Sequence, residues 1–312
     1  MTLDNTEIPY VNSIFQQPWW LNAVAPDRWS EVVLNVGDKI VARLPYTIEK
    51  KFSLTLLRLP PLTQTLGPWL RPSAAKYTNQ LAEQKELMSE LIKQLPAYDY
   101  FAQQFHYSIT NWLPFYWNGF NQTTRYTYVI ENLEDLDLIW HEFRENIRRE
   151  IRKAQKQVRV RTDLGIERFL DINLLTFQRQ GEELPYSREL VRRLDAACAE
   201  RQARQIFFAE DAKGQVHAAI YIVWDNNSAY YLMGGGDPKL RSSGATSLLM
   251  WEAIKFTSTV TNKFDFEGSM GEAVERFFRA FGARQIPYFR VTHMSRRMKL
   301  LMAGREMVKA FV

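Results

Sequence analysis

The chain of 312 residues has almost no cysteine and no long apolar run. Its single cysteine, Cys198, cannot form an internal disulfide, and no histidine or motif stands near it to activate the thiol. No apolar stretch approaches the ~20 residues that a membrane-spanning helix needs. Residues 1–7 also lack the basic-then-apolar order of a secretory signal. We therefore expect a cytoplasmic protein without a membrane span.

The motifs of several enzyme classes are missing as well. The histidines are scattered, at His106, His141, His217 and His293, and give no metal-binding spacing, so no metal is expected. The sequence contains no nucleophile elbow, no Walker loop and no serine triad motif. Zinc enzymes, P-loop nucleotidases and serine hydrolases are therefore not expected.

The chain does contain ample apolar material and a small excess of positive charge. Apolar residues make up 46% and charged residues 24% of the sequence, as in ordinary soluble proteins. The length exceeds the usual size of a single core and favours two domains. A net charge of +5 indicates an anionic ligand, without distinguishing a nucleotide, a nucleic acid and a membrane surface.

The first part of the chain is predicted to be mixed in secondary structure. Strands over 29–35 and 40–48 flank a Gly37-Asp38 turn, which is a good hairpin signal. Further elements are predicted as a strand over 54–59, a helix over 79–94 and a strand over 98–105. A strand at 125–131 can bridge to a second unit. We place the two domains at 1–125 and 126–312.

The second domain is predicted to start with a long basic helix over 133–157, which has one apolar stripe. A strand follows at 158–162, then helices over 166–180 and 187–201. Three antiparallel strands over 205–210, 216–224 and 229–233 then lead into a glycine-rich loop. A dinucleotide-binding fold would place such a loop after a first parallel strand, so that fold is not expected.

The glycine-rich loop is the most informative segment, because a strand precedes it and an apolar helix follows it. Unpaired N–H groups in the first turn of a helix and the helix dipole favour an anion there. The plain alternative is a helix start with Ser242 or Ser243 as the N-cap. The residues expected to hold a phosphate-bearing ligand are Gly234, Gly235, Gly236, Arg241, Ser242, Ser243, Gly244, Ala245 and Thr246.

The segment Phe264-Asp265-Phe266-Glu267 is predicted to be a strand with two carboxylates on one face. A carboxylate held near an acceptor amine can take its proton while the nitrogen attacks a carbonyl. Asp265 and Glu267 are therefore the expected catalytic residues. The alternatives are a solvated strand end and a salt bridge to a nearby arginine.

The long helix carries a cationic flank that includes Arg148 and Arg152, both expected to anchor an anionic substrate or a tRNA backbone. The alternative is a solvated face, since Glu142, Glu145 and Glu150 dilute the charge. Aromatic side chains are expected either to line a substrate cleft or to pack in the cores. Those assigned to substrate binding are Trp112, Tyr116, Tyr128 and Tyr230.

Several segments together resemble the Fem peptidyltransferase group and its relatives in the GNAT superfamily. Arg241-Ser-Ser-Gly244-Ala-Thr246 resembles the acetyl-CoA-binding signature of GNAT acyltransferases, with Thr246 where that signature has glycine or alanine. The other matching segments are 146–156, 264–268, 276–282, 15–20 and 59–69. The resemblance covers nearly the whole chain. It implies an α+β protein of two tandem GNAT-like domains, each a mixed, mostly antiparallel sheet flanked by helices.

The same resemblance implies transfer of an acyl or aminoacyl group to a small-molecule or peptide amine. The donor would be an acyl-CoA thioester or an aminoacyl-tRNA. The chain departs from Fem enzymes at Phe278, where they usually have lysine, and it lacks their long coiled-coil arm. These departures and Thr246 favour an alternative, a catalytically inactive GNAT-like protein that binds a nucleotide-linked or nucleic-acid partner through the basic helix 144–156.

Overall fold

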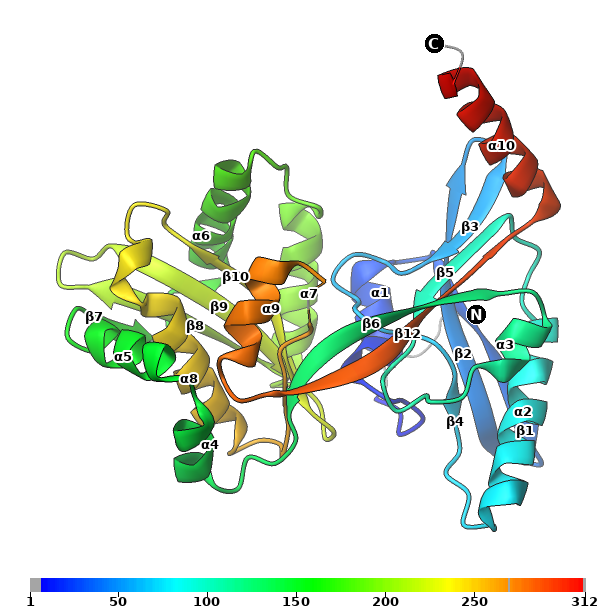
Figure 1. The fold of residues 1–312 in the computed structure, drawn as a ribbon, viewed down its shortest axis with the longest axis horizontal. Coiled ribbons are helices and arrows are strands. Elements are labelled where there is room, and N and C mark those ends of the chain that lie inside the picture. The colour runs from blue at the N-terminus through cyan, green and yellow to red at the C-terminus, as the bar shows by residue number, and fades with distance from the viewer. Residues whose placement is uncertain (1–6, 269, 311–312) are drawn as a thin grey trace. The chain divides into compact units, whose positions relative to one another are not determined.

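The computed structural model describes residues 7–268 and 270–310 (Figure 1). They form two compact units, one from Met1–Arg125 with Pro287–Val312 and the other from Tyr126–Ile286. The chain enters the second unit within β6 (Asn121–Ile130) and leaves it within β12 (Arg284–Met294). Residues 1–6, which entered the expectation of no secretory signal, lie outside the described residues. Among the described helices, none has the length and apolar character to cross a membrane.

The described residues after Ile286 belong to the first unit, although the predicted boundary places them in the second domain, 126–312. The reason is strand pairing across a long sequence separation. Arg290 to Met294 of β12 pair antiparallel with β5 (Tyr100–Gln104), and Val291 is fully buried in the core of this unit. Such a pairing cannot be found from local sequence patterns.

The first unit is a mixed sheet flanked by helices, with strand order β1-β2-β3-β5-β12 and β4 paired to β2. The predicted hairpin is present, since β1 pairs antiparallel with β2 and Gly37 occupies the turn with φ +60°. Strand β3 runs parallel to β5. Met88 and Leu91 of α2 (Tyr77–Lys93) pack with Phe101 and Phe105 in the core. The remaining elements are η1 (Ile14–Gln16), α1 (Pro18–Val24), β1 (Trp29–Val36), β2 (Lys39–Lys51), β3 (Leu54–Arg58), β4 (Trp69–Leu70), α2 (Tyr77–Lys93), α3 (Leu113–Trp117) and α10 (Arg296–Ala310).

The second unit is a sheet with strand order β6-β11-β10-β9-β8-β7, in which the pair β10–β11 is parallel and the pairs β11–β6, β10–β9, β9–β8 and β8–β7 are antiparallel. The predicted meander before the glycine-rich loop is therefore confirmed, as is the α+β class. The remaining elements are α4 (Leu136–Glu142), α5 (Glu145–Ala154), β7 (Val158–Arg161), α6 (Gly165–Gln180), α7 (Arg188–Glu200), β8 (Arg204–Asp211), β9 (Val216–Trp224), β10 (Ala229–Gly236), η2 (Arg241–Ser243), α8 (Ala245–Thr257), β11 (Phe264–Asp265) and α9 (Glu272–Arg279).

Helices cover both faces of this second sheet. On one face, Ile151 of α5 and Leu249 of α8 pack against Ile220 and Phe264 of the sheet. On the other face lie α6 and α7, where the ring of Phe169 contacts that of Tyr221 with 5.6 Å between centroids (Figure 1). The alternation of β9 therefore separates two apolar layers.

The predicted helix over 133–157 is wrong in one respect, because it is broken into α4 and α5. Phe143 and Arg144 are extended at the break. The Phe143 ring packs on Trp251 and Phe281, with centroids 5.2 and 5.0 Å away, and the Arg144 N–H donates to Ala280 O at 2.9 Å. Contacts with residues more than a hundred positions away decide the break.

Candidate active site

A cleft of about 420 Å³ opens in the second unit where β10 ends and α8 begins. Strand β10 pairs with β11 only through Ala229 and Tyr230, although it stays paired with β9 as far as Gly236. From Tyr231 onward, the other edge of β10 has no partner strand among the described residues. A free strand edge offers backbone donors and acceptors to an extended ligand.

The three glycines at the end of β10 all line the cleft, but their neighbours differ. A Cβ at Gly235 would lie 2.5 Å from the Asn173 Cα of α6, so this glycine lets the helix pack on the strand. The sequence interpretation assigned that space to a ligand, and the helix occupies it. Gly234 O accepts from Asn173 Nδ2 at 2.7 Å, and the Gly236 N–H donates to Thr176 Oγ1 at 3.0 Å.

The loop after β10 brings the start of α8 to the cleft. Arg241, Ser243, Ala245 and Thr246 line it, whereas Ser242 and Gly244 are not lining residues. Gly244 precedes the helix with φ +79°, and a Cβ there would lie 2.6 Å from Glu150 O of α5. The Ala245 N–H donates to Ser243 Oγ at 3.3 Å. Gly244 is therefore required by the backbone turn and by the packing of α5.

The cleft carries positive charge at this end. The exposed guanidinium groups of Arg179, near the end of α6, and Arg241, in η2, both line it. In the described part of the chain, neither forms an ion pair. Lys153 Nζ of α5 donates to the Ser242 O at 2.6 Å and adds a cation beside the loop. Together with the first turn of α8, these groups favour an anion.

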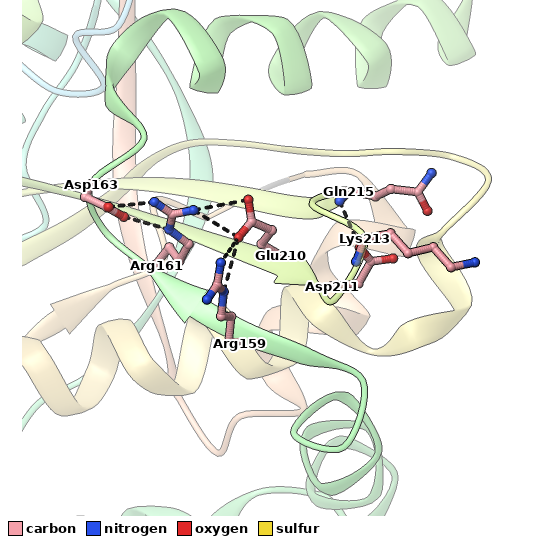
Figure 2. A network of polar contacts seen from close by, with 7 residues as sticks. All are labelled: Arg159, Arg161, Asp163, Glu210, Asp211, Lys213 and Gln215. Carbon is pink, nitrogen blue, oxygen red and sulfur yellow. Dashed lines mark hydrogen bonds and ion pairs between the residues drawn. The ribbon is translucent and has the colours of Figure 1, made fainter.

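His217 also lines the cleft, and it is 7% exposed. Its Nε2 lies 3.4 Å from Asp211 Oδ2, and its buried Nδ1 has no hydrogen-bond partner among the residues described. Asp211 is held in turn by the N–H groups of Gln215 at 2.8 Å and Lys213 at 2.9 Å (Figure 2). The bond from Gln215 is the largest cause that lowers the pKa of Asp211, which keeps the carboxylate ionised beside the imidazole.

The end of β8, where Asp211 stands, is fixed by a network of ion pairs. Glu210 binds Arg159 at 2.7 Å and Arg161 at 3.0 Å, and Arg161 also binds Asp163 at 2.6 Å (Figure 2). The hydrogen bond from Arg159 is the largest cause that lowers the pKa of Glu210. The network attaches the edge strand β7 to β8 and so supports the turn that carries Asp211.

The opposite wall of the cleft is largely apolar and comes from α9. Ala273, Val274, Phe277 and Phe278 line it, and the Phe278 ring lies 5.9 Å from that of Tyr231. A Cβ at Gly234 would lie 1.9 Å from Tyr231 Oη, so this hydroxyl rests on the glycine at the cleft floor. Burial raises the pKa of Tyr231 well above its usual range, and its hydroxyl stays protonated at neutral pH.

The two carboxyl groups predicted to be catalytic lie near each other but are not lining residues of this cleft. Asp265 is 4% exposed, and its Oδ1 accepts from Thr127 Oγ1 and from the Glu267 N–H. Burial raises the pKa of Asp265 to about 6. Burial, and then the charge of Asp265, raise the pKa of Glu267. Strand β11 ends at Asp265, because Glu267 has φ +61°. The observed strand is therefore shorter than the predicted strand over 264–267.

The expected substrate-binding residues are not lining residues of the cleft either. Arg148 and Arg152 share Glu145, at 2.8 and 3.3 Å. Tyr128 is buried, and its hydroxyl donates to Glu275 Oε1 at 2.7 Å. Tyr230 is a buried residue of β10. Trp112 and Tyr116 belong to the first unit, where their rings contact each other with centroids 5.6 Å apart.

Sequence reasoning missed His217, Tyr231 and Arg179. His217 was seen only as one of several scattered histidines, because its partner Asp211 lies across a turn. The sequence does predict the hairpin of β8 and β9, and its short turn places Asp211 and His217 at the same end of the two strands. The place of Tyr231 depends on where β10 separates from β11, which no local pattern gives.

Comparison with known proteins assigns this site to a class. Residues 141–279 match the sequence family described as the acetyltransferase (GNAT) domain, and every residue named for the cleft lies within that range. The cleft therefore lies in the part of the chain that is similar to this acetyltransferase domain. No curated protein sequence matches the chain.

Solved structures extend the likeness to most of the chain. FemX is similar with a TM-score of 0.67 and 12% identity, over 88% of this chain and 91% of that one. A tandem GNAT protein from the clavulanic acid biosynthesis pathway has a TM-score of 0.52 and 11% identity, over 86% and 84%. The C-terminal domain of a putative lysylphosphatidylglycerol synthetase from Agrobacterium fabrum has a TM-score of 0.55 and 9% identity, over 89% of each. The predicted resemblance to the GNAT superfamily and its Fem-like members is confirmed.

Proposed function

We propose that this protein is an N-acyltransferase that holds an acyl-CoA thioester in the cleft of the second unit and transfers the acyl group to an amine. The observation that carries the proposal is the junction of β10 and α8. There a free strand edge, the first turn of a helix and two arginines meet in one cleft. These are the features needed to bind an extended ligand that ends in phosphate groups.

Different lining residues would bind the pyrophosphate, the amide-containing arm and the acyl group of such a donor. The N–H groups of the first turn of α8, with Arg241 and Arg179, would hold the pyrophosphate. The amide-containing arm would lie along the edge of β10 from Tyr231 toward Gly236. Gly234 O and the Gly236 N–H are already bonded to Asn173 and Thr176 of α6, so the backbone groups nearer Tyr231 would bind the arm. The acyl end would lie against Val274 and Phe277 of α9. Thr246 would stand at the closest approach of the phosphates.

The transfer needs one proton acceptor and one proton donor. The amine nitrogen attacks the thioester carbonyl carbon, a C–N bond forms and the C–S bond breaks. The Tyr231 hydroxyl gives a proton to the departing sulfur, and the proton that leaves the nitrogen passes to water. His217 lies level with Asp237, beyond Gly236, and so at the phosphate end of this donor. We therefore assign His217, which Asp211 holds in place, to binding the phosphate end of the donor.

Binding of a non-hydrolysable acyl-CoA analogue, measured by calorimetry, tests the donor. Arg241→Ala is expected to weaken binding roughly 10- to 100-fold, the value of one lost charge-assisted contact. Arg284→Ala is the matched control, since Arg284 is 80% exposed and pairs with Glu131 outside the cleft. No detectable heat with the analogue, or equal losses in both variants, would reject the proposal.

Aminoacyl-tRNA is the other donor that the Fem likeness suggests. A charged tRNA titrated in the same way distinguishes the two, because a phosphate-backbone ligand loses affinity steeply as salt rises. Tight tRNA binding without acyl-CoA binding would move the donor site away from the cleft of β10 and α8.

A further inference from the structure

A second surface of unusual composition lies in the first unit, where α10 begins beside the turn between β2 and β3 (Figure 1). Arg297 joins the two segments, since its Nη1 donates to Ser53 O at 3.1 Å. We call this region the α10–turn surface. It consists of Lys50, Lys51, Phe52, Arg296, Arg297, Lys299, Leu300, Leu301 and Met302.

Large apolar side chains of this surface are exposed to water. Phe52 is 93% exposed and has φ +55°, a backbone region that residues with a side chain rarely adopt. Leu300, Leu301 and Met302 are 75%, 50% and 38% exposed. A turn that presents a phenylalanine outward, next to a helix start with exposed leucines, leaves apolar area that folding of this unit does not bury.

The same surface is cationic. Lys50, Lys51, Arg296, Arg297 and Lys299 are exposed and lie next to the apolar residues along the chain. The acids beside them are already engaged: Asp99 is 13% exposed and lies 3.9 Å from Arg297, and Glu49 pairs with Arg58 at 3.7 Å. A net positive charge therefore remains around Phe52 and Leu300.

We propose that the α10–turn surface docks onto the surface of an anionic lipid bilayer. Such binding requires exposed apolar side chains that enter the headgroup region and neighbouring lysine and arginine side chains that meet lipid phosphates. Lysine is depleted from protein–protein interfaces, so the lysines here favour lipid over a protein partner. The inference does not depend on the donor cleft, which lies in the other unit.

Co-sedimentation of the full chain with vesicles tests this inference. Binding is expected to vesicles of phosphatidylcholine with phosphatidylserine, to weaken as salt rises, and to be absent with phosphatidylcholine alone. The triple variant Phe52→Ser, Leu300→Ser, Leu301→Ser and the charge reversal Lys50→Glu, Lys51→Glu are each expected to weaken binding at least roughly tenfold.

Val36→Ser with Tyr77→Ser is the matched control, because these residues are 65% and 75% exposed on other parts of the same unit. It is expected to bind vesicles like the unmodified chain. Circular dichroism of every variant shows whether it is folded. Equal binding to both kinds of vesicle, or unchanged binding by the folded triple variant, would overturn the inference. So would a dimer in sedimentation that the triple variant abolishes, since a second copy would then cover the surface.

Discussion

His217 shows how much the chemistry of one side chain depends on its neighbours. The imidazole is buried at the cleft, and Asp211 faces its Nε2 while two backbone N–H groups hold that carboxylate. The Nδ1 atom has no partner among the described residues. A buried polar atom without a partner is costly, and a bound ligand would relieve that cost.

Replacing His217 therefore tests its part in binding the donor. We expect His217→Asn to weaken acyl-CoA binding roughly tenfold, the value of one lost hydrogen bond to a charged group, with little change in kcat. Asp211→Asn keeps the bonds from Gln215 and Lys213 and is expected to have a smaller effect. Calorimetry measures the affinity, and steady-state kinetics with an amine acceptor measures kcat. A large fall of kcat in His217→Asn with unchanged acyl-CoA affinity would instead assign proton transfer to His217.

The burial of Asp265 predicts that the free energy of unfolding depends on pH. Burial raises its pKa from 3.8 to about 6, so folding favours the protonated form. That contribution is complete below about pH 4 and is lost as the pH rises through about 6. Asp265→Asn removes this titration. As the pH rises from 4 to 7, the free energy of unfolding of the variant should therefore increase by up to about 3 kcal/mol relative to that of the unmodified chain. Urea unfolding across this range measures the difference, and a constant difference would contradict it.

At the scale of elements, the contact of α5 with the start of α8 rests on Gly244. Its left-handed backbone and its closeness to Glu150 O both exclude a side chain. Gly214 is a matched control, with φ +77° and nothing within 4 Å of its Cβ position. Gly214→Ala is expected to cost about 1 kcal/mol, and Gly244→Ala at least roughly 1 kcal/mol more. Equal losses of unfolding free energy would show that α5 moves aside without cost.

The edge strand β7 gives a second test at this scale. Glu210 binds Arg159 and Arg161 of β7 from β8, so Glu210→Gln should loosen the strand. Hydrogen exchange of residues 158–161 is expected to accelerate, while β9 keeps its protection. Glu200→Gln is the control, because its partner Arg201 lies on the same segment. Unchanged exchange would mean that the backbone ladder alone holds β7.

The elements also show what the sequence can and cannot predict. The hairpin at Gly37 and the meander before Gly234 follow from local alternation and turn residues, and both are present. The break between α4 and α5 does not, because the helical apolar spacing continues through Phe143 while Trp251 and Ala280 decide its backbone. The glycine-rich loop could also be predicted, because its glycines follow directly after an alternating strand. That Gly235 faces α6 instead of a ligand depends on tertiary packing.

At the scale of the whole molecule, the first unit is built from two segments that lie far apart in the sequence, one before Tyr126 and one after Ile286. A chain that stops after Ile286 lacks the part of β12 that pairs with β5, whereas one that stops after Ser295 retains it. We expect the shorter chain to lose hydrogen-exchange protection in residues 100–104 and to keep it in β9. The longer one should keep both. Equal protection of β5 in the two chains would show that the pairing contributes little to the first unit.

The return of β12 to the first unit also sets an order of events on the ribosome. Residues 126–286 emerge as one continuous stretch, so the second unit can fold while residues 287–294 are still being added. The first sheet begins earlier in the chain but must wait for Arg290 to Met294, and until then one edge of β5 is uncovered. The half that is synthesised first is thus the half that is completed last.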